Sequence, residues 1–152
     1  MLFVLQIFIE NECGSTTKHH HDEERMILLR TEQVRAPYPF PYGFVPGTRA
    51  PDGDCADCFV ITSQPLHTGE LVDCELLGLL EQTESGLVDH NVLAVPAGEP
   101  APDLDDLQAP LTGFILAVFA GMSGRETTVG RFLGPEAALA YLDACRPPPP
   151  GT

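Results

Sequence analysis

Short runs of β-type residues separated by turns constrain the fold of this chain more than any other sequence feature. They lie at residues 3–10, 26–29, 58–62, 69–80 and 91–96. Gly, Pro and Asp residues separate the runs at close spacing, which favours a small barrel over a sandwich. The apolar opening run is too short to span a bilayer and lacks the basic segment and cleavage site of a signal peptide, so we interpret it as the first strand.

Helical patterns appear only near the end of the chain. Residues 110–122 and 135–145 each begin with Pro, which suits the first position of a helix, and the second segment has Glu136 near its start and Arg146 near its end. The Pro- and Asp-rich residues 97–109 then form a linker. We therefore expect a single α+β domain over residues 1–146, a barrel with two C-terminal helices, and a disordered Pro-rich tail over residues 147–152.

The charge of the chain excludes several kinds of partner. It carries 22 acidic and 8 basic side chains, for a net charge of −14, and has no basic cluster for nucleic acid or an anionic membrane. The expected partners are cations, or anions carried in by cations. Five scattered cysteines lack the density of a disulfide scaffold and indicate a reducing, cytoplasmic location.

Three aspartates, Asp52, Asp54 and Asp57, fall within six residues after a tyrosine- and proline-rich segment. In an extended chain residues two apart share a face, and a kink would bring Asp57 round beside the other two. Such a set of oxygen ligands suits Mg²⁺ better than Zn²⁺ or Ca²⁺. Taken alone, however, an Asp-Gly-Asp stretch is more often a solvated turn.

Two other clusters have ordinary interpretations. Cys55 and Cys58 form a CxxC pair, but no second pair accompanies them, so we interpret them as core residues. The run His19, His20 and His21 is most simply an exposed polar loop, with contact between His20 and a site as the alternative.

A longer pattern resembles the family I soluble inorganic pyrophosphatases. The motif Y-x-x-x-Y-G, followed after a short interval by D-G-D-x-x-D and a β run, matches that family. Lys18, Arg30, Tyr38 and Tyr42 follow the family's order at nearly its spacing, as does the block from Thr83 to Pro96. The resemblance is good over roughly residues 4–100 and poor in the helical end.

The resemblance implies a fold, an activity and roles for individual residues. The fold is a five-stranded barrel of the oligonucleotide-binding (OB) type with helices packed on it, and the activity is Mg²⁺-dependent cleavage of pyrophosphate into two phosphates. Asp54 would orient or deprotonate the attacking water. The metal ligands would be Asp52, Asp57 and Asp89, with Glu84 and Glu10 as further candidates; Lys18, Arg30 and Tyr42 would hold phosphate oxygens, and Tyr38 would support the pocket.

Several positions depart from the family pattern. A family glutamate is His20 here, a metal-site aspartate is Glu84, and a lysine two residues after Asp89 is Asn91. The expected Tyr-Lys pair falls near Val118 and Phe119. Gln6 competes with Glu10 for the acidic position of the first strand. The metal half of the expected site is thus retained, whereas the phosphate half has lost cations.

These departures leave alternatives open. The chain is either a working pyrophosphatase, in which Arg49, Arg125 or the histidines replace the lost cations, or a relative that binds metal and phosphate without efficient hydrolysis. A hydrolase of another small phosphorylated substrate and a structural subunit that pairs with an active homologue are further alternatives. The resemblance also implies a homo-oligomer, a hexamer or a dimer.

Overall fold

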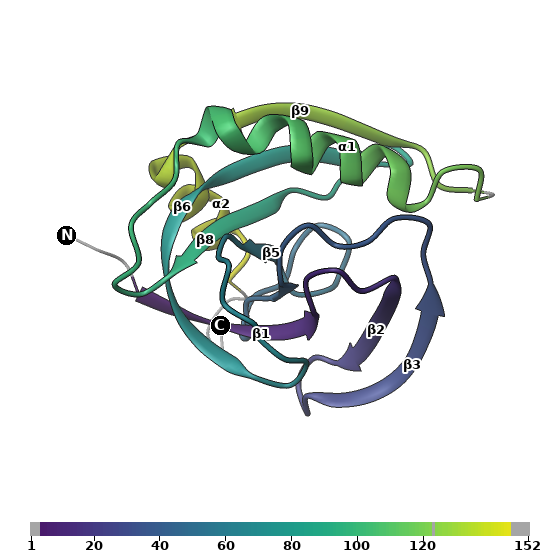
Figure 1. Cartoon of the computed structure of the whole chain (residues 1–152), viewed down its shortest axis with the longest axis horizontal. Coiled ribbons are helices and arrows are strands. Elements are labelled where there is room, and N and C mark those ends of the chain that lie inside the picture. Colours follow the sequence, from purple (N-terminus) through teal and green to yellow (C-terminus); the bar gives the residue numbers. More distant parts are fainter. Residues whose placement is uncertain (1–3, 123, 147–152) are drawn as a thin grey trace, which may run out of the picture.

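Five strands close into a barrel in the computed structural model, which describes residues 4–122 and 124–146 (Figure 1). They are β1 (Val4–Asn11), β4 (Tyr42–Phe44), β5 (Asp57–Val60), β8 (Asn91–Pro96) and β6 (Leu71–Glu84), hydrogen-bonded in that order. The barrel closes because β6 also pairs with β1, with Leu5 opposite Cys74. The expected OB-like α+β barrel is confirmed.

Strand β6 is long enough to pair with several neighbours in turn. Its first part pairs with β1, its middle with β8, and its end with β9 (Thr127–Leu133) and the short β7 (Leu87–Val88). The pairing register shifts between Leu76 and Gly78 and again between Leu80 and Gln82. Such bulges bend a strand and increase its twist, which suits the closure of a small barrel.

Two hydrophobic clusters explain why several strands are apolar at every position rather than at alternate ones. In β5, Cys58 and Val60 belong to one cluster and Phe59 to the other. The first cluster includes Leu142 of helix α2 (Pro135–Ala144), and the second includes Leu111 of helix α1 (Gln108–Val118). Strands buried on both faces are hydrophobic throughout.

The helices differ in part from the sequence-based expectation. Helix α2 lies where it was expected, but α1 begins two residues before Pro110 and ends at Val118 rather than Met122. A 3₁₀ helix, η1 (Leu104–Leu107), occupies part of the expected linker, and Asp103 caps it by accepting a hydrogen bond from the amide of Asp105. Pro110 is tolerated inside the first turn because that turn's amides have no partners within the helix.

The sequence-based expectation missed four strands, β2, β4, β7 and β9, and misplaced β3. Residues 19–21, expected to lie in an exposed polar loop, belong to β2 (Thr17–Asp22), which pairs with β3 (Ile27–Gln33) in a separate two-stranded ribbon. Strand β3 extends beyond the expected run at residues 26–29 and lies in this ribbon rather than in the barrel. Strand β9 was not expected at all. The side chains of β2 are half-buried along its whole length, so this strand shows neither an apolar run nor an alternating pattern.

The expected disordered tail lies outside the described residues. Within the described part of the chain, no helix has both the length and the apolar character needed to cross a membrane.

Candidate metal and phosphate site

Parallel pairing of two strands brings together aspartates that are far apart in the sequence. Strands β5 and β8 pair in parallel with Asp57 opposite Asn91. Both strands therefore begin at the same end of the sheet. Asp89, just before β8, lies beside Asp57, the first residue of β5.

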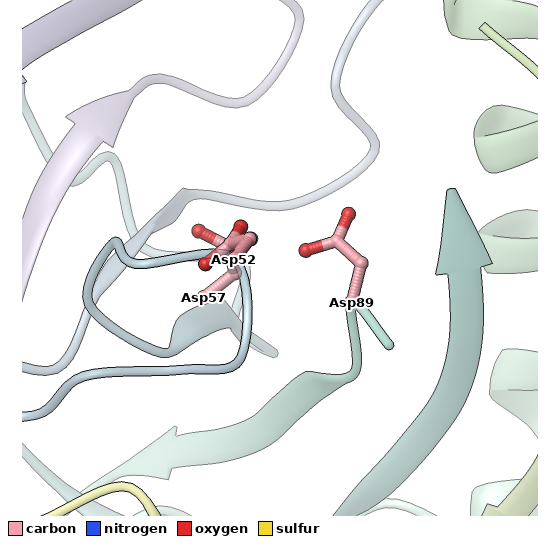
Figure 2. Close-up of side chains that lie close together, drawn as sticks. All are labelled: Asp52, Asp57 and Asp89. Atoms are coloured by element: carbon pink, nitrogen blue, oxygen red, sulfur yellow. The ribbon is translucent and has the colours of Figure 1, made fainter. Parts of the chain in front are cut away.

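A tight turn adds the third carboxylate. The backbone amide of Asp54 donates to a carboxylate oxygen of Asp52 at 3.0 Å, and Gly53 between them has φ of 92°, a value that suits glycine. One carboxylate oxygen from each of Asp52, Asp57 and Asp89 lies within 4.8 Å of the other two. Figure 2 shows the three side chains pointing toward one another. Asp89 thus takes the place in the cluster that simple spacing predicted for Asp54.

The electrostatics of the cluster favour a bound cation. Burial, together with the neighbouring Asp89, raises the pKa of Asp57 well above its usual value. Burial also raises the pKa of Asp89 to about 6 and moves that of Asp52 upward. Carboxylates crowded in this way resist full ionisation unless positive charge is supplied. Three oxygen donors of this kind fit a hard divalent ion.

Lys18, on β2, interacts electrostatically with two of these aspartates, Asp57 and Asp89. Burial alone would lower the pKa of Lys18, but Tyr38, Asp57, Glu10 and Asp89 raise it, so the side chain stays protonated. Its ammonium lies 5.2 Å from the ring centre of Tyr42. Burial raises the pKa of both Tyr38 and Tyr42, which keeps them neutral and able to donate a hydrogen bond.

A cavity of about 330 Å³ connects these groups. It is large enough for a small-molecule site. Nine of the ten predicted site residues line it, and Arg30 does not: the nine are Glu10, Lys18, Tyr38, Tyr42, Asp52, Asp54, Asp57, Glu84 and Asp89.

 

Glu10 rather than Gln6 is the acidic residue of β1 that reaches the site. Glu10 is buried, lines the cavity, and accepts hydrogen bonds from the backbone amide and Nδ1 of His21 at 3.3 and 3.1 Å. Burial raises the pKa of Glu10 to about 7, although Lys18 opposes the rise. Gln6 is exposed and pairs with Asp73 on the outer part of the barrel sheet.

Arg30 is exposed on β3 and does not line the cavity, whereas Glu32 on the same strand does. Lys18 lies directly opposite Glu32 in the β2–β3 ribbon, and Arg30 lies opposite His20. Residues two apart on a strand share a face, so Arg30 lies on the same face of the ribbon as Lys18 and Glu32. The contact of Arg30 with phosphate stays a prediction.

The remaining departures from the family pattern also line the cavity. Asn91 is buried and donates through Nδ2 to Gln82 at 2.7 Å. Val118 and Phe119 supply an apolar wall at the end of α1.

Arg49 lies elsewhere, with its backbone amide bonded to Cys145 at the end of α2. Cys58 is buried in the core, as expected, whereas Cys55 is half-buried and belongs to neither hydrophobic cluster.

Sequence reasoning missed two acidic residues of the cavity, Glu23 and Glu32. Glu23 lies in the turn after β2 and accepts a hydrogen bond from the amide of Cys55 at 2.9 Å, which ties that turn to the aspartate loop. Burial raises the pKa of Glu23 to about 7. Nothing in the local sequence separates either residue from the other surface acids.

A barrel with clustered carboxylates near a protonated lysine and two neutral tyrosines fits one class of protein, the metal-dependent enzymes that act on phosphate compounds. Comparison with known proteins agrees. A sequence profile of the inorganic pyrophosphatase family matches residues 7–145.

Curated relatives and solved structures point the same way. The chain is 33% identical over 151 residues to an inorganic pyrophosphatase of Geobacillus stearothermophilus, covering 93% of this chain and 92% of the relative. The inorganic pyrophosphatase structure from Helicobacter pylori superposes with a TM-score of 0.85 at 25% identity, covering 93% and 91% of the two chains. The Thermus thermophilus structure gives 0.83 at 26% identity, covering 93% and 88%. This chain belongs to the inorganic pyrophosphatase family, whose members are hydrolases.

Proposed function

We propose that this protein hydrolyses inorganic pyrophosphate to two phosphates with Mg²⁺ as its cofactor. The single observation that carries the proposal is the convergence of Asp52, Asp57 and Asp89 at the mouth of the barrel. Their oxygens suit Mg²⁺, which is commonly bound by a few carboxylates together with substrate phosphates. Glu10 and Glu84 line the same cavity and are the further candidate ligands.

Divalent ions bound there would neutralise the polyanionic substrate, make the attacking water more acidic and stabilise the departing phosphate. The chain's own groups have separate tasks. Asp54 lies on the turn beside the cluster, where its carboxylate can orient or accept a proton from water. Lys18 and Tyr42 donate to phosphate oxygens, and Tyr38, whose ring lies 5.3 Å from that of Tyr42, keeps this wall in position.

The loss of family lysines weakens the phosphate side of the site in this proposal. Asn91 replaces one lysine and directs its amide nitrogen to Gln82 rather than into open space. Removing a preorganised electrostatic contact typically lowers turnover by about 10²–10³. We therefore expect slower turnover than in a relative that keeps these lysines.

Phosphate release from pyrophosphate by the purified chain tests the proposal. We expect release in Mg²⁺, none after addition of EDTA, and recovery when Mg²⁺ is restored in excess. Binding of Mg²⁺ and phosphate without release would instead identify a binding protein. Faster release from a small phosphate ester than from pyrophosphate would identify a different substrate.

Location and assembly are also proposals. The free thiol state of all five cysteines supports a reducing compartment, and we propose the cytoplasm. We further propose that the chain forms a homo-oligomer, a dimer or hexamer, which light scattering of the purified protein would test.

A further inference from the structure

We infer that Arg125 is a substrate-binding residue of this site and supplies a cationic contact that the sequence pattern lacks at Asn91 and at the end of α1. The inference rests on the proposed function and names the group that holds the second phosphoryl unit. Among the described residues that line the cavity, Lys18 and Arg125 are the two that carry a lysine or arginine charge.

The position of Arg125 is fixed by a stacking contact. Its guanidinium carbon lies 4.0 Å from the ring centre of Phe119, and the ammonium of Lys18 lies 5.9 Å from the same centre. A guanidinium over an aromatic face is held by the ring quadrupole. Phe119, which cannot itself bind phosphate, thereby positions two cations on one wall of the cavity.

A carboxylate of β3, that of Glu32, orients the same guanidinium. Nη2 of Arg125 donates to both oxygens of Glu32 at 3.4 Å, and Glu32 also accepts from Nε2 of His20 at 2.8 Å. Burial alone would raise the pKa of Glu32, but His20 and Arg125 hold that pKa below its usual value. Among the described residues, the hydrogen bonds donated by this guanidinium come from Nη2. The N–H groups of Nε and Nη1 are therefore available to a ligand.

The chemistry of the fork suits a phosphoryl group. Arginine can donate two parallel hydrogen bonds to two oxygens of one phosphate, a geometry that lysine cannot provide. The acidic side chains of the cavity repel an anion that arrives without cations, so each positive side chain that lines the cavity has a large effect. Glu32 and His20 act as positioning residues in this arrangement because they contact Arg125 or Glu32 rather than the substrate.

The test compares Arg125→Gln with Arg131→Gln. Arg131 is an exposed residue of the neighbouring strand β9 that pairs with Glu81 at 2.7 Å and does not line the cavity. Calorimetry gives the Kd for Mg²⁺ alone and the Kd for methylenediphosphonate in the presence of Mg²⁺; this diphosphonate resists hydrolysis. Steady-state kinetics gives KM and kcat for pyrophosphate.

We expect Arg125→Gln to weaken binding of the diphosphonate by about tenfold or more, equivalent to about 1.4 kcal/mol, and to raise KM, with Kd for Mg²⁺ alone within about twofold. Arg125→Lys should recover part of the loss, and Arg131→Gln should change neither Kd. A diphosphonate Kd in Arg125→Gln within twofold of the unmodified protein, matching Arg131→Gln, would overturn the inference. Failure of the unmodified protein to hydrolyse pyrophosphate would reject the proposed function separately, since the diphosphonate titration does not depend on turnover.

Discussion

Lys18 and Arg30 differ in burial, although the sequence pattern treats them alike. Lys18 lines the cavity and lies close enough to Asp57, Glu10 and Asp89 for their charges to raise its pKa. Arg30 is exposed on the opposite strand of the ribbon and does not line the cavity. A contact between Lys18 and phosphate therefore needs less movement than one between Arg30 and phosphate.

Replacing these residues gives a matched pair of variants. We expect Lys18→Gln to lower kcat/KM for pyrophosphate by about 10²–10³, the effect of removing a preorganised electrostatic contact. Arg30→Gln should have a smaller effect, because Arg30 is exposed and does not line the cavity. Steady-state phosphate release measures both. Equal losses in the two variants would show that Arg30 also contacts phosphate during turnover.

Most individual site residues could be predicted from the sequence, and the family resemblance also grouped Asp52, Asp57 and Asp89. The aspartate motif and the two tyrosines led to the cavity, but spacing alone paired Asp54 with Asp52 and Asp57. Asp89 joins that cluster because two strands run parallel, a long-range fact that local spacing does not contain. Glu23 and Glu32 were missed for the same reason: their roles depend on which loop or strand lies opposite them.

At the scale of elements, the site depends on close approach between strands β1 and β4. A Cβ atom added at Gly43 would collide with the backbone carbonyl of Phe8 on the paired strand, and backbone cannot move aside as a side chain can. Gly43 directly follows Tyr42. Glycine at this position therefore allows the barrel to close with Tyr42 facing the cavity.

We expect Gly43→Ala to lower the free energy of unfolding by about 1–3 kcal/mol, as overpacking does, and to weaken binding of substrate through displacement of Tyr42. The matched control is Gly113→Ala in helix α1, where an added Cβ meets open space. That change should stabilise the protein by up to about 1 kcal/mol, because alanine favours the helix over glycine. Urea titrations of both variants measure the difference. A Gly43→Ala variant as stable as the unmodified protein would contradict the proposed close approach.

Elements with an apolar period were predictable and those without one were not. Strand β8 and helix α2 were found at nearly their true bounds because burial or a proline start marks them. Strand β2 was taken for a turn, since its polar side chains face the cavity, and β9 was missed between two helices. Functional requirements at the site thus removed the hydrophobic pattern on which strand prediction depends.

At the scale of the whole molecule, buried acidic groups make stability depend on pH. The pKa of Glu23 is raised by burial from 4.5 to about 7 in the folded protein. The folded state therefore holds this proton more tightly than the unfolded state. The resulting stabilisation is complete below about pH 4.5 and is lost as the pH rises to about 7.

We expect metal-free Glu23→Gln protein to have nearly the Tm of the unmodified protein at pH 5 and a Tm higher by a few degrees at pH 8. Glutamine keeps an oxygen for the amide of Cys55 but cannot ionise, so it avoids the buried charge. The control is Glu126→Gln at an exposed position of the chain, which should show the same difference at both values of pH. A Tm difference for Glu23→Gln that is larger at pH 5 than at pH 8 would contradict the raised pKa.

The central claim is that the carboxylate cluster binds the ions that make pyrophosphate cleavage possible. The most direct test measures Mg²⁺ affinity and phosphate release of Asp57→Asn in the same sample. Asp143→Asn, an exposed change on helix α2, is the control. The account predicts that Asp57→Asn weakens Mg²⁺ binding and lowers phosphate release by about 10² or more, while Asp143→Asn changes neither. Undiminished Mg²⁺ binding and phosphate release in Asp57→Asn would contradict it.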